Sequence, residues 1–264
     1  MLARLEHENM IEAIALAGAN AEGAVVRRGD GVALIATGLP LRLFNQVIVE
    51  GDDARVDAVR AAVALTRARG DQFVVNLRVG TDDRLSPLMQ ELGLLPISEE
   101  PTPGMALHPI SAGAGPDPLP DHEIRQVTDT AGVEDHIKTA AAGFELPEAV
   151  LRSIITPTMA QRAGFAAYVG YTEHGPVTTG LGIRTGRTIG AYNIATLPAA
   201  RRRGYGAAMT ARVIADGAAA GCDVAILQSS RMGHSVYERL GFRTVVEYMG
   251  YIEPPGDKPA AGVQ

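Results

Sequence analysis

Hydrophobic positions in the first half of the chain alternate between helical and strand-like spacing. Leu2, Leu5, Ile11 and Ile14 lie on one face of an opening amphipathic helix. Short apolar runs and further helical segments follow in turn, which is typical of helices packed on a sheet. The predicted elements are strands over 24–26, 32–35, 46–49 and 73–77, and helices over 54–69 and 85–92.

The second half repeats this order of elements. Its predicted strands cover 124–127, 165–171, 177–183, 188–196, 224–227 and 242–251, and its predicted helices cover 133–144, 147–161, 204–220 and 233–240. Asn45 and Asn193 are 193 − 45 = 148 positions apart, and Gly93 and Gly241 are 241 − 93 = 148 positions apart. We therefore expect an internal duplication that gives two tandem α/β units with mixed sheets.

A proline- and glycine-rich stretch separates the two halves. Six prolines lie between Glu99 and Asp121, where they disfavour a helix or a central strand. The predicted organisation is a first domain over 1–110, a linker over 111–121, a second domain over 122–254 and a flexible tail over 255–264. Residues 105–108, within this stretch, retain the pattern of a short strand.

Composition narrows the classes of function. Of 264 residues, 46% are hydrophobic and 20% charged, which is ordinary for a globular protein. The net charge of −6 argues against nucleic acid as a partner. The single cysteine, Cys222, excludes an intrachain disulfide, and there is no zinc-type cluster, so we expect no metal. No apolar run reaches the roughly 18 residues of a membrane span, so we expect a cytoplasmic protein with no membrane partner.

The segment 198–207 carries the first chemical signal. Three arginines, Arg201, Arg202 and Arg203, precede Gly204 and Gly206 between a predicted strand and a predicted helix. Unpaired N–H groups at a helix N-terminus attract anions, and arginine pairs with phosphate oxygens. The segment is therefore a candidate phosphate-binding loop, although a solvated basic turn gives the same pattern.

Two motifs in this half resemble those of the GNAT superfamily of N-acetyltransferases. Arg201-x-x-Gly204-x-Gly206, after the strand 188–196, is similar to the superfamily's acyl-CoA pyrophosphate loop. The spacing of Ser230, Tyr237 and Gly241-Phe242 is similar to its second signature. Ser230 and Gly233 stand where the family usually has Asn and Ala. The resemblance covers the second half directly and the first half only through the duplication.

The resemblance implies a function and a set of site residues. The protein would transfer an acetyl group from acetyl-CoA to an amine without a covalent acyl-enzyme. Tyr237 would lie near the sulfur as the catalytic proton donor, and Ser230 would take the place of the usual Asn. The other implied cofactor-binding residues are Ile194, Ala195 and Thr196 along the pantetheine arm, and Arg201, Arg202, Arg203, Gly204, Tyr205 and Gly206 around the pyrophosphate.

The chemistry of direct transfer is consistent with these residues. A backbone N–H of the strand 194–196 can stabilise the developing oxyanion. A phenol can protonate the leaving thiolate, although without the resemblance Tyr237 is a half-buried aromatic residue on a short helix. The general base stays open among Glu173, His174, His234, Glu247 and water.

The first half lacks the residues of the candidate site. At the offset of 148, Asp53 stands opposite Arg201, Val56 opposite Gly204, Ala58 opposite Gly206 and Met89 opposite Tyr237. We predict that this half binds no acyl-CoA and serves as a scaffold, or that it shapes the acceptor pocket.

Two further hypotheses compete with an enzyme. The protein could be a non-catalytic acyl-CoA-binding regulatory module, or a structural duplicate with no ligand. The sequence does not identify the acceptor, which we expect to be a small-molecule or peptide amine. We expect a monomer or a homodimer.

Overall fold

The computed structural model describes residues 1–111 and 119–254, which form two compact units that interleave along the chain. The large unit comprises Met1–Glu22 and Thr102–Val246, and the small unit comprises Gly23–Pro101 and the segment from Glu247. These bounds differ from the predicted 1–110 and 122–254. Most of the predicted linker, 112–118, and the predicted tail, 255–264, lie outside the described residues.

The small unit contains a mixed sheet in the order β1-β2-β3-β4-β12, with β5 paired to β12. Strands β3 and β4 are parallel, and the other neighbours are antiparallel. Its strands are β1 (Val25–Gly29), β2 (Val32–Ala36), β3 (Asn45–Val49), β4 (Val74–Arg78), β5 (Leu95–Pro96) and the end of β12 (Arg243–Ile252). Its helices are α2 (Val56–Arg69) and α3 (Ser86–Glu91), with short 3-10 turns η1 (Arg42–Phe44) and η2 (Asp83–Leu85).

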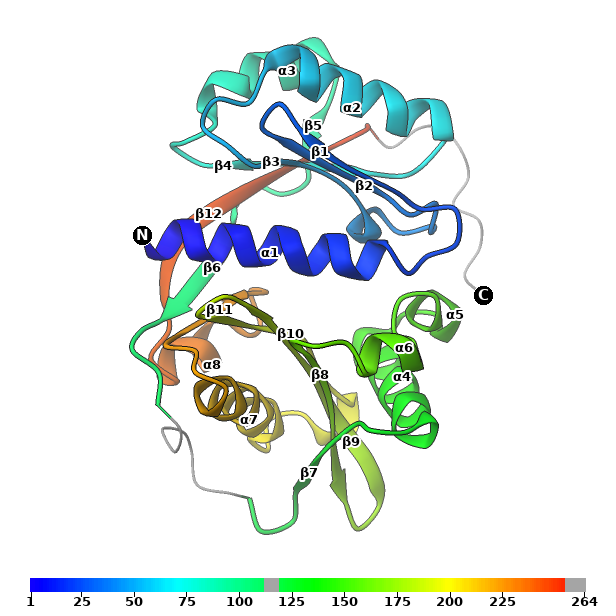
Figure 1. Cartoon of the computed structure of the whole chain (residues 1–264), viewed down its shortest axis with the longest axis vertical. Coiled ribbons are helices and arrows are strands. Elements are labelled where there is room, and N and C mark those ends of the chain that lie inside the picture. Colours follow the sequence, from blue (N-terminus) through cyan, green and yellow to red (C-terminus); the bar gives the residue numbers. More distant parts are fainter. Residues whose placement is uncertain (112–118, 255–264) are drawn as a thin grey trace. The chain divides into compact units, whose positions relative to one another are not determined.

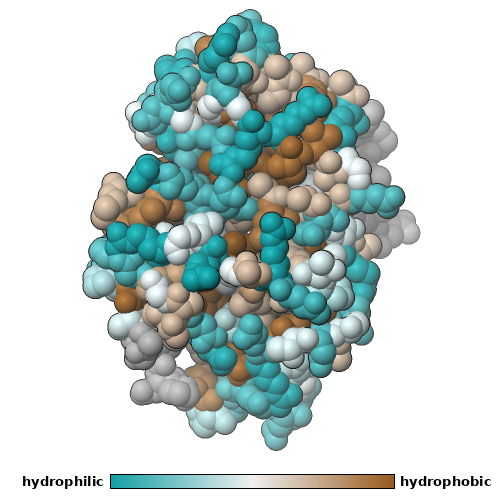
Figure 2. Space-filling model, viewed as in Figure 1, coloured by the Kyte–Doolittle hydropathy of each residue, from teal (hydrophilic) through white to brown (hydrophobic). Residues whose placement is uncertain are grey.

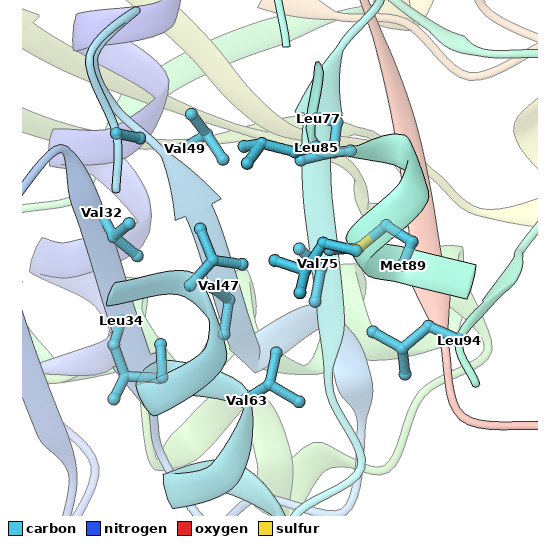
Figure 3. Close-up of a cluster of buried hydrophobic side chains, with 14 of the residues drawn as sticks. Val32, Leu34, Val47, Val49, Val63, Val75, Leu77, Leu85, Met89 and Leu94 are labelled. Carbon is cyan, nitrogen blue, oxygen red and sulfur yellow. The ribbon is translucent and has the colours of Figure 1, made fainter. Parts of the chain in front are cut away.

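The core of the small unit lies between this sheet and its helices (Figure 3). Val47 and Val75 on the parallel strands, Val63 on α2 and Leu85 before α3 are all fully buried. Each such side chain contributes about 1.5–3 kcal/mol by leaving water. The small unit therefore has the packed core that a scaffold requires.

The large unit has the strand order β6-β11-β10-β9-β8-β7 (Figure 1). Strands β10 and β11 are parallel. The strands are β6 (Thr102–Leu107), β7 (Glu123–Gln126), β8 (Phe165–Thr172), β9 (Gly175–Thr185), β10 (Thr188–Thr196) and β11 (Val224–Gln228). The helices are α1 (Leu2–Gly18), α4 (Thr130–Phe144), α5 (Glu148–Arg152), α6 (Pro157–Ala160), α7 (Tyr205–Ala219) and α8 (His234–Arg239), with one 3-10 turn, η3 (Pro198–Ala200).

Helices cover both faces of this sheet. On β10, Ile189 packs against Gly217 of α7, and the next residue, Gly190, faces Asn9 of α1. Because neighbouring strand residues point to opposite faces, α7 and α1 lie on opposite sides. Farther along β10, Ile194 and Met209 of α7 both lie against Gly180, and the next residue, Ala195, lies against Gly143 of α4, so α4 is on the side opposite α7.

The predicted helix over 147–161 is wrong and is replaced by α5 and α6. The cause is Pro157, which disfavours a helical conformation for Thr156 and begins a new helix instead. The Thr156 hydroxyl accepts a hydrogen bond from the N–H of Met159 at 3.2 Å and caps α6.

The last strand of each half of the sequence pairs in the structural unit that is built mainly from the other half of the sequence. Strand β6 pairs antiparallel with β11 in the large unit, from Gly104 to Leu107. The end of β12 pairs antiparallel with β4 and β5 in the small unit. Helix α1 also belongs to the large unit, although it opens the first half of the sequence.

The offset of 148 holds at one pair of helices and fails elsewhere. After α3 and α8, Gly93 and Gly241 both have positive φ, at 69° and 95°. Each is followed by a bond back into its helix, from Leu94 N to Met89 O at 2.9 Å and from Phe242 N to Tyr237 O at 3.0 Å. In the parallel pairs, however, Gln46 of β3 corresponds to Thr188 of β10, an offset of 188 − 46 = 142. The offset therefore varies along the chain, and at the starts of α2 and α7 it is 205 − 56 = 149.

The surface in Figure 2 is a mosaic of hydrophilic and hydrophobic side chains. No helix of the described chain is both long and apolar enough to cross a membrane.

Candidate functional site

The loop between β10 and α7 presents backbone N–H groups at a helix start. Gly204 caps α7 with φ at 90°, and Arg202 has φ at 64°, so the chain turns sharply twice. Within residues 1–111 and 119–254, no hydrogen bond uses the N–H groups of Arg202, Arg203 or Gly204. The first turn of α7 contains no acidic residue. These unpaired donors and the helix dipole make the loop a candidate anion site.

The three arginines of this loop have different surroundings. The Arg201 guanidinium donates to the carbonyl oxygens of Gly143 at 2.9 Å and Thr196 at 3.3 Å, so it braces α4 and the end of β10. Arg203 donates to the Asp121 carboxylate at 2.9 Å. Arg202 is exposed. Of the three side chains predicted to pair with phosphate, Arg202 is therefore the one that the described chain leaves available.

Tyr205 is an anchor beneath the loop. Its side chain is 1% exposed, and its hydroxyl donates to the Asp121 carboxylate at 2.6 Å. Its ring packs on His122 with a centroid distance of 4.6 Å. The side chain predicted to bind the cofactor thus lies inside the protein and fixes the first turn of α7. Gly206 has room for a small side chain, since an added Cβ would come no closer than 3.5 Å to Thr196.

Strand β10 separates from β11 beside this loop. Parallel pairing between them stops at Gly190, while β11 continues to pair with β6 as far as Gln228. On its other side, the pairing of β10 with β9 shifts between Tyr192 and Ala195, which is a β-bulge. The backbone of Ile194, Ala195 and Thr196 therefore lies on a stretch that β11 does not cover, where an extended ligand can add as a strand does.

Tyr237 of α8 is a half-buried phenol. An added Cβ on Gly233 would lie 2.9 Å from its ring, so the glycine that replaces the family's usual Ala makes space for it. The ring also contacts Phe242 edge-on, at 6.1 Å between centroids. Burial raises the pKa of Tyr237 above its ordinary value of 10.0, so the hydroxyl keeps its proton at neutral pH. Tyr237 and Ile194 pack against the same core cluster.

Ser230 shapes the start of α8. Its Oγ accepts a hydrogen bond from the N–H of Gly233 at 3.2 Å. The side chain is exposed, so the hydroxyl is used for local structure at the rim of the unit.

A cavity of about 520 Å³ lies between α7, α8 and the segment after β6. Its walls are mainly apolar, and on α7 they include Ala207, two residues after the first residue of the helix. The lining residues are Leu107, Pro109, Ile110, Ser111, Ala207, Ala211, Ile214, Val236, Arg239 and Leu240. The candidate anion site and this mainly apolar cavity are therefore neighbours on α7.

The four candidate bases lie on different elements. Glu173 and His174 form an exposed pair on the β8–β9 turn, with 3.5 Å between the charged groups. His234 lies 3.7 Å from Glu238 on α8, and Glu247 is exposed on the part of β12 in the small unit. Cys222 is buried, and burial raises the pKa of its thiol, so it is a poor nucleophile.

One polar pair was missed in the sequence. His136 is fully buried on α4, and its Nε2 lies 2.9 Å from the Nδ2 of Asn193 at the bulge. The sequence feature that could have revealed this pair is a histidine on the apolar face of the predicted helix 133–144, one turn from Val133 and Ala140. The bulge itself depends on the pairing register and leaves no mark in the hydrophobic pattern. Among the described residues, no group of three or more His, Cys, Asp or Glu could hold a metal ion.

Comparisons with known proteins agree with this geometry. Residues 161–244 match the family model described as acetyltransferase (GNAT) domain. A GCN5-related N-acetyltransferase from Kribbella flavida is 16% identical, with a TM-score of 0.68 over 97% of this chain and 96% of that chain. A tandem GNAT protein from the clavulanic acid biosynthesis pathway is 14% identical, with a TM-score of 0.57 over 97% of this chain and 98% of that chain. No curated protein sequence matches the chain. At these identities the solved structures show the fold.

Proposed function

Because the C-terminal half carries a GNAT acetyltransferase domain within a tandem GNAT fold, we propose that the protein transfers an acetyl group from acetyl-CoA to a primary amine. The observation that carries this proposal is the anion-binding turn at Arg202, Arg203 and Gly204, directly beside the uncovered stretch of β10. One surface thus offers donors for a pyrophosphate and a strand edge for an amide-containing arm.

The pyrophosphate and the pantetheine arm of acetyl-CoA each have a matching feature. The N–H groups of the turn and the Arg202 side chain hold the pyrophosphate, and the backbone of Ile194, Ala195 and Thr196 pairs with the pantetheine arm. The adjoining cavity receives the apolar part of the ligand next to α7 and α8. Arg201, Tyr205 and Ser230 contribute by fixing the backbone around it.

The reaction proceeds by direct attack in a ternary complex. The amine nitrogen forms a bond to the thioester carbonyl carbon, and a backbone N–H of β10 stabilises the developing oxyanion. The carbon–sulfur bond then breaks, and the Tyr237 phenol donates its proton to the leaving thiolate. A thiol in water has a pKa of about 8.5, so the leaving thiolate takes up a proton at neutral pH. The Tyr237 phenolate then recovers its own proton from solvent. The amine loses its own proton to water.

The acceptor is a small-molecule or peptide amine. The net charge of −6 disfavours nucleic acid as a partner. We further propose that the chain acts as a monomer or homodimer in the cytoplasm, and that the small unit binds no acyl-CoA.

Calorimetric titration of the full chain with acetyl-CoA tests the proposal, together with thiol release in the presence of amines. The expected result is one site per chain and amine-dependent thiol release. Two sites per chain would show that the small unit also binds the cofactor. Binding without thiol release for any amine would favour a regulatory acyl-CoA-binding module, and no binding would overturn the proposal.

A further inference from the structure

Asn193 occupies an unusual position on β10. It lies in the bulge with φ at 51°, a left-handed conformation that few side chains adopt. Its side-chain Nδ2 faces the Nε2 of His136 at 2.9 Å. No donor in the described part of the chain bonds its Oδ1, and the residue is partly exposed.

His136 determines which way the Asn193 carboxamide points. The Nδ1 of His136 lies 3.0 Å from the backbone oxygen of Tyr168, which only accepts, so Nδ1 carries a hydrogen. Burial lowers the pKa of His136 to about 4, so the ring is neutral at neutral pH and Nε2 is an acceptor. It therefore takes a hydrogen bond from Nδ2 of Asn193, and Oδ1 is held on the far side of the carboxamide.

The carbonyl groups of the bulge are already engaged. The Thr179 hydroxyl donates to the backbone oxygen of Asn193 at 3.1 Å. The Thr178 hydroxyl donates to the backbone oxygen of Ala195 at 2.6 Å. Asn193 Oδ1 is thus an oriented acceptor without a donor in the described chain, next to the uncovered stretch of β10 and on the face opposite α7.

We propose that Asn193 Oδ1 accepts a hydrogen bond from the acceptor amine, and that His136 is a positioning residue that keeps this oxygen turned toward the substrate. This inference rests on the proposed acetyltransferase function. In the proposed complex acetyl-CoA lies on the α7 side of β10, and the amine reaches the thioester from the α4 side, where the His136–Asn193 pair lies.

A carboxamide suits an amine nucleophile better than a carboxylate does. A carboxylate at this place would stabilise the ammonium form, which has no lone pair for attack. A neutral oxygen orients the N–H without holding the extra proton. Asn193 takes up no proton, so the proton that the amine loses still passes to water.

The test compares four variants of the full-length protein: Asn193→Ala, His136→Leu, His136→Gln and the double variant Asn193→Ala/His136→Leu. Thiol release is measured with acetyl-CoA and a panel of spermidine, free lysine and an N-terminal peptide. For the best amine, Asn193→Ala should lower kcat/KM roughly 10- to 100-fold, as loss of one oriented hydrogen bond does. The Kd for acetyl-CoA should be unchanged.

His136→Leu should show a smaller loss of the same kind, because the carboxamide is then free to rotate. His136→Gln keeps an acceptor for Nδ2 and should recover most of the activity. The double variant should be no worse than Asn193→Ala alone, because both changes act through Oδ1. Asn76→Ala is the matched control: Asn76 also lies on a strand, is half-buried and has a single Nδ2 bond, to Gln46 at 2.8 Å. It should leave both constants unchanged.

Each other outcome is decisive. If the wild type acetylates an amine and Asn193→Ala keeps its kcat/KM, the inference fails while the proposed function stands. If Asn193→Ala weakens the binding of acetyl-CoA instead, Asn193 helps to bind the acetyl donor, and the inference is overturned. Additive losses in the double variant would assign His136 a purely structural role. If the wild type releases no thiol with any amine of the panel, the proposed function fails, and the inference fails with it.

Discussion

The two strand–loop–helix corners, β10 to α7 and β3 to α2, have the same topology and opposite chemistry. At the small-unit corner, the Gly31 carbonyl accepts hydrogen bonds from the N–H groups of Glu50 and Gly51. The Arg84 guanidinium donates to the carbonyl oxygens of Asp52 and Ala54 at 2.9 and 2.8 Å. At the large-unit corner, the N–H groups of residues 202–204 have no partner in the described chain. In the two residues directly before the helix, the N–H groups of Ala54 and Arg55 donate to the carbonyl oxygens of Gly51 and Asp30 at 3.2 and 3.1 Å, whereas those of Arg203 and Gly204 have no partner in the described chain. These unpaired donors make the large-unit corner the candidate anion site.

Charge and strand length strengthen this contrast. Helix α2 begins at an extended cap, Arg55, and has Asp57 in its first turn, whereas α7 begins at the left-handed Gly204 with no acid. Strands β3 and β10 each make three parallel pairs with their neighbour. Strand β3 has 5 residues and β10 has 9, so only β10 extends well beyond its partner. The small unit therefore has the same strand–loop–helix corner but lacks the long uncovered strand edge of β10.

The largest effect is expected in the core of the small unit. Leu85→Ala removes a fully buried side chain and should lower the free energy of unfolding by about 2–5 kcal/mol. Leu95→Ala is the matched control, since Leu95 is 50% exposed. Thermal unfolding measures the loss, and calorimetry should show the same Kd for acetyl-CoA in both variants below their transition temperatures. A weakened Kd in Leu85→Ala would contradict a scaffold role.

Lowering the pH should destabilise the large unit, which contains all six histidines of the chain. The pKa of buried His136 falls from 6.5 to about 4 on folding, so the unfolded chain binds the extra proton first. The contribution of neutral His136 to the free energy of unfolding is complete above pH 6.5. About 3 kcal/mol of that free energy is lost as the pH falls from 6.5 to about 4. The Tm of the wild type should therefore fall more steeply over this range than that of His136→Leu. A control variant, His174→Gln on the exposed turn, should follow the wild type.

Converting one corner toward the other tests the comparison directly. Gly206 and Asp57 are both the second residue of their helices, so Gly206→Asp gives α7 the acid that α2 has. The acetyl-CoA Kd should rise about 100-fold, or roughly 2.7 kcal/mol, because a carboxylate then repels the pyrophosphate. Asp57→Gly should change neither affinity nor stoichiometry. An unchanged Kd in Gly206→Asp would place the pyrophosphate elsewhere.

The smallest effect concerns Tyr237, whose counterpart in the small unit is Met89. Tyr237 in α8 and Met89 in α3 hold equivalent positions, since the carbonyl oxygen of each accepts the bond from the residue after the glycine. Tyr237→Phe should lower kcat about tenfold without changing the acetyl-CoA Kd. In the wild type, the fall of kcat that follows loss of the phenol proton should come at a higher pH than for a phenol in water, because burial raises the pKa of Tyr237. Tyr251→Phe, in the small unit, serves as the control. If Tyr237→Phe keeps the full kcat, Tyr237 is not the proton donor to the thiolate.

The sequence was informative where chemistry depends on neighbouring residues. The loop around Gly204, the helix with Tyr237 and the shared turn at Gly93 and Gly241 are local patterns, and the fold they predicted is confirmed. The bounds of the units could not be predicted, because an apolar run predicts a strand but not its neighbour, as β6 demonstrates. Likewise, nothing in the sequence distinguishes the bracing Arg201 from the exposed Arg202.

The exchange of last strands has a consequence for synthesis on the ribosome. Residues 23–101 are translated early, yet their sheet is completed only by residues 247–252, which emerge after the whole large unit. The large unit in turn needs α1, the first helix translated. A nascent chain therefore carries an open sheet edge at β4 through most of its translation, and neither half is a finished folding unit before the other.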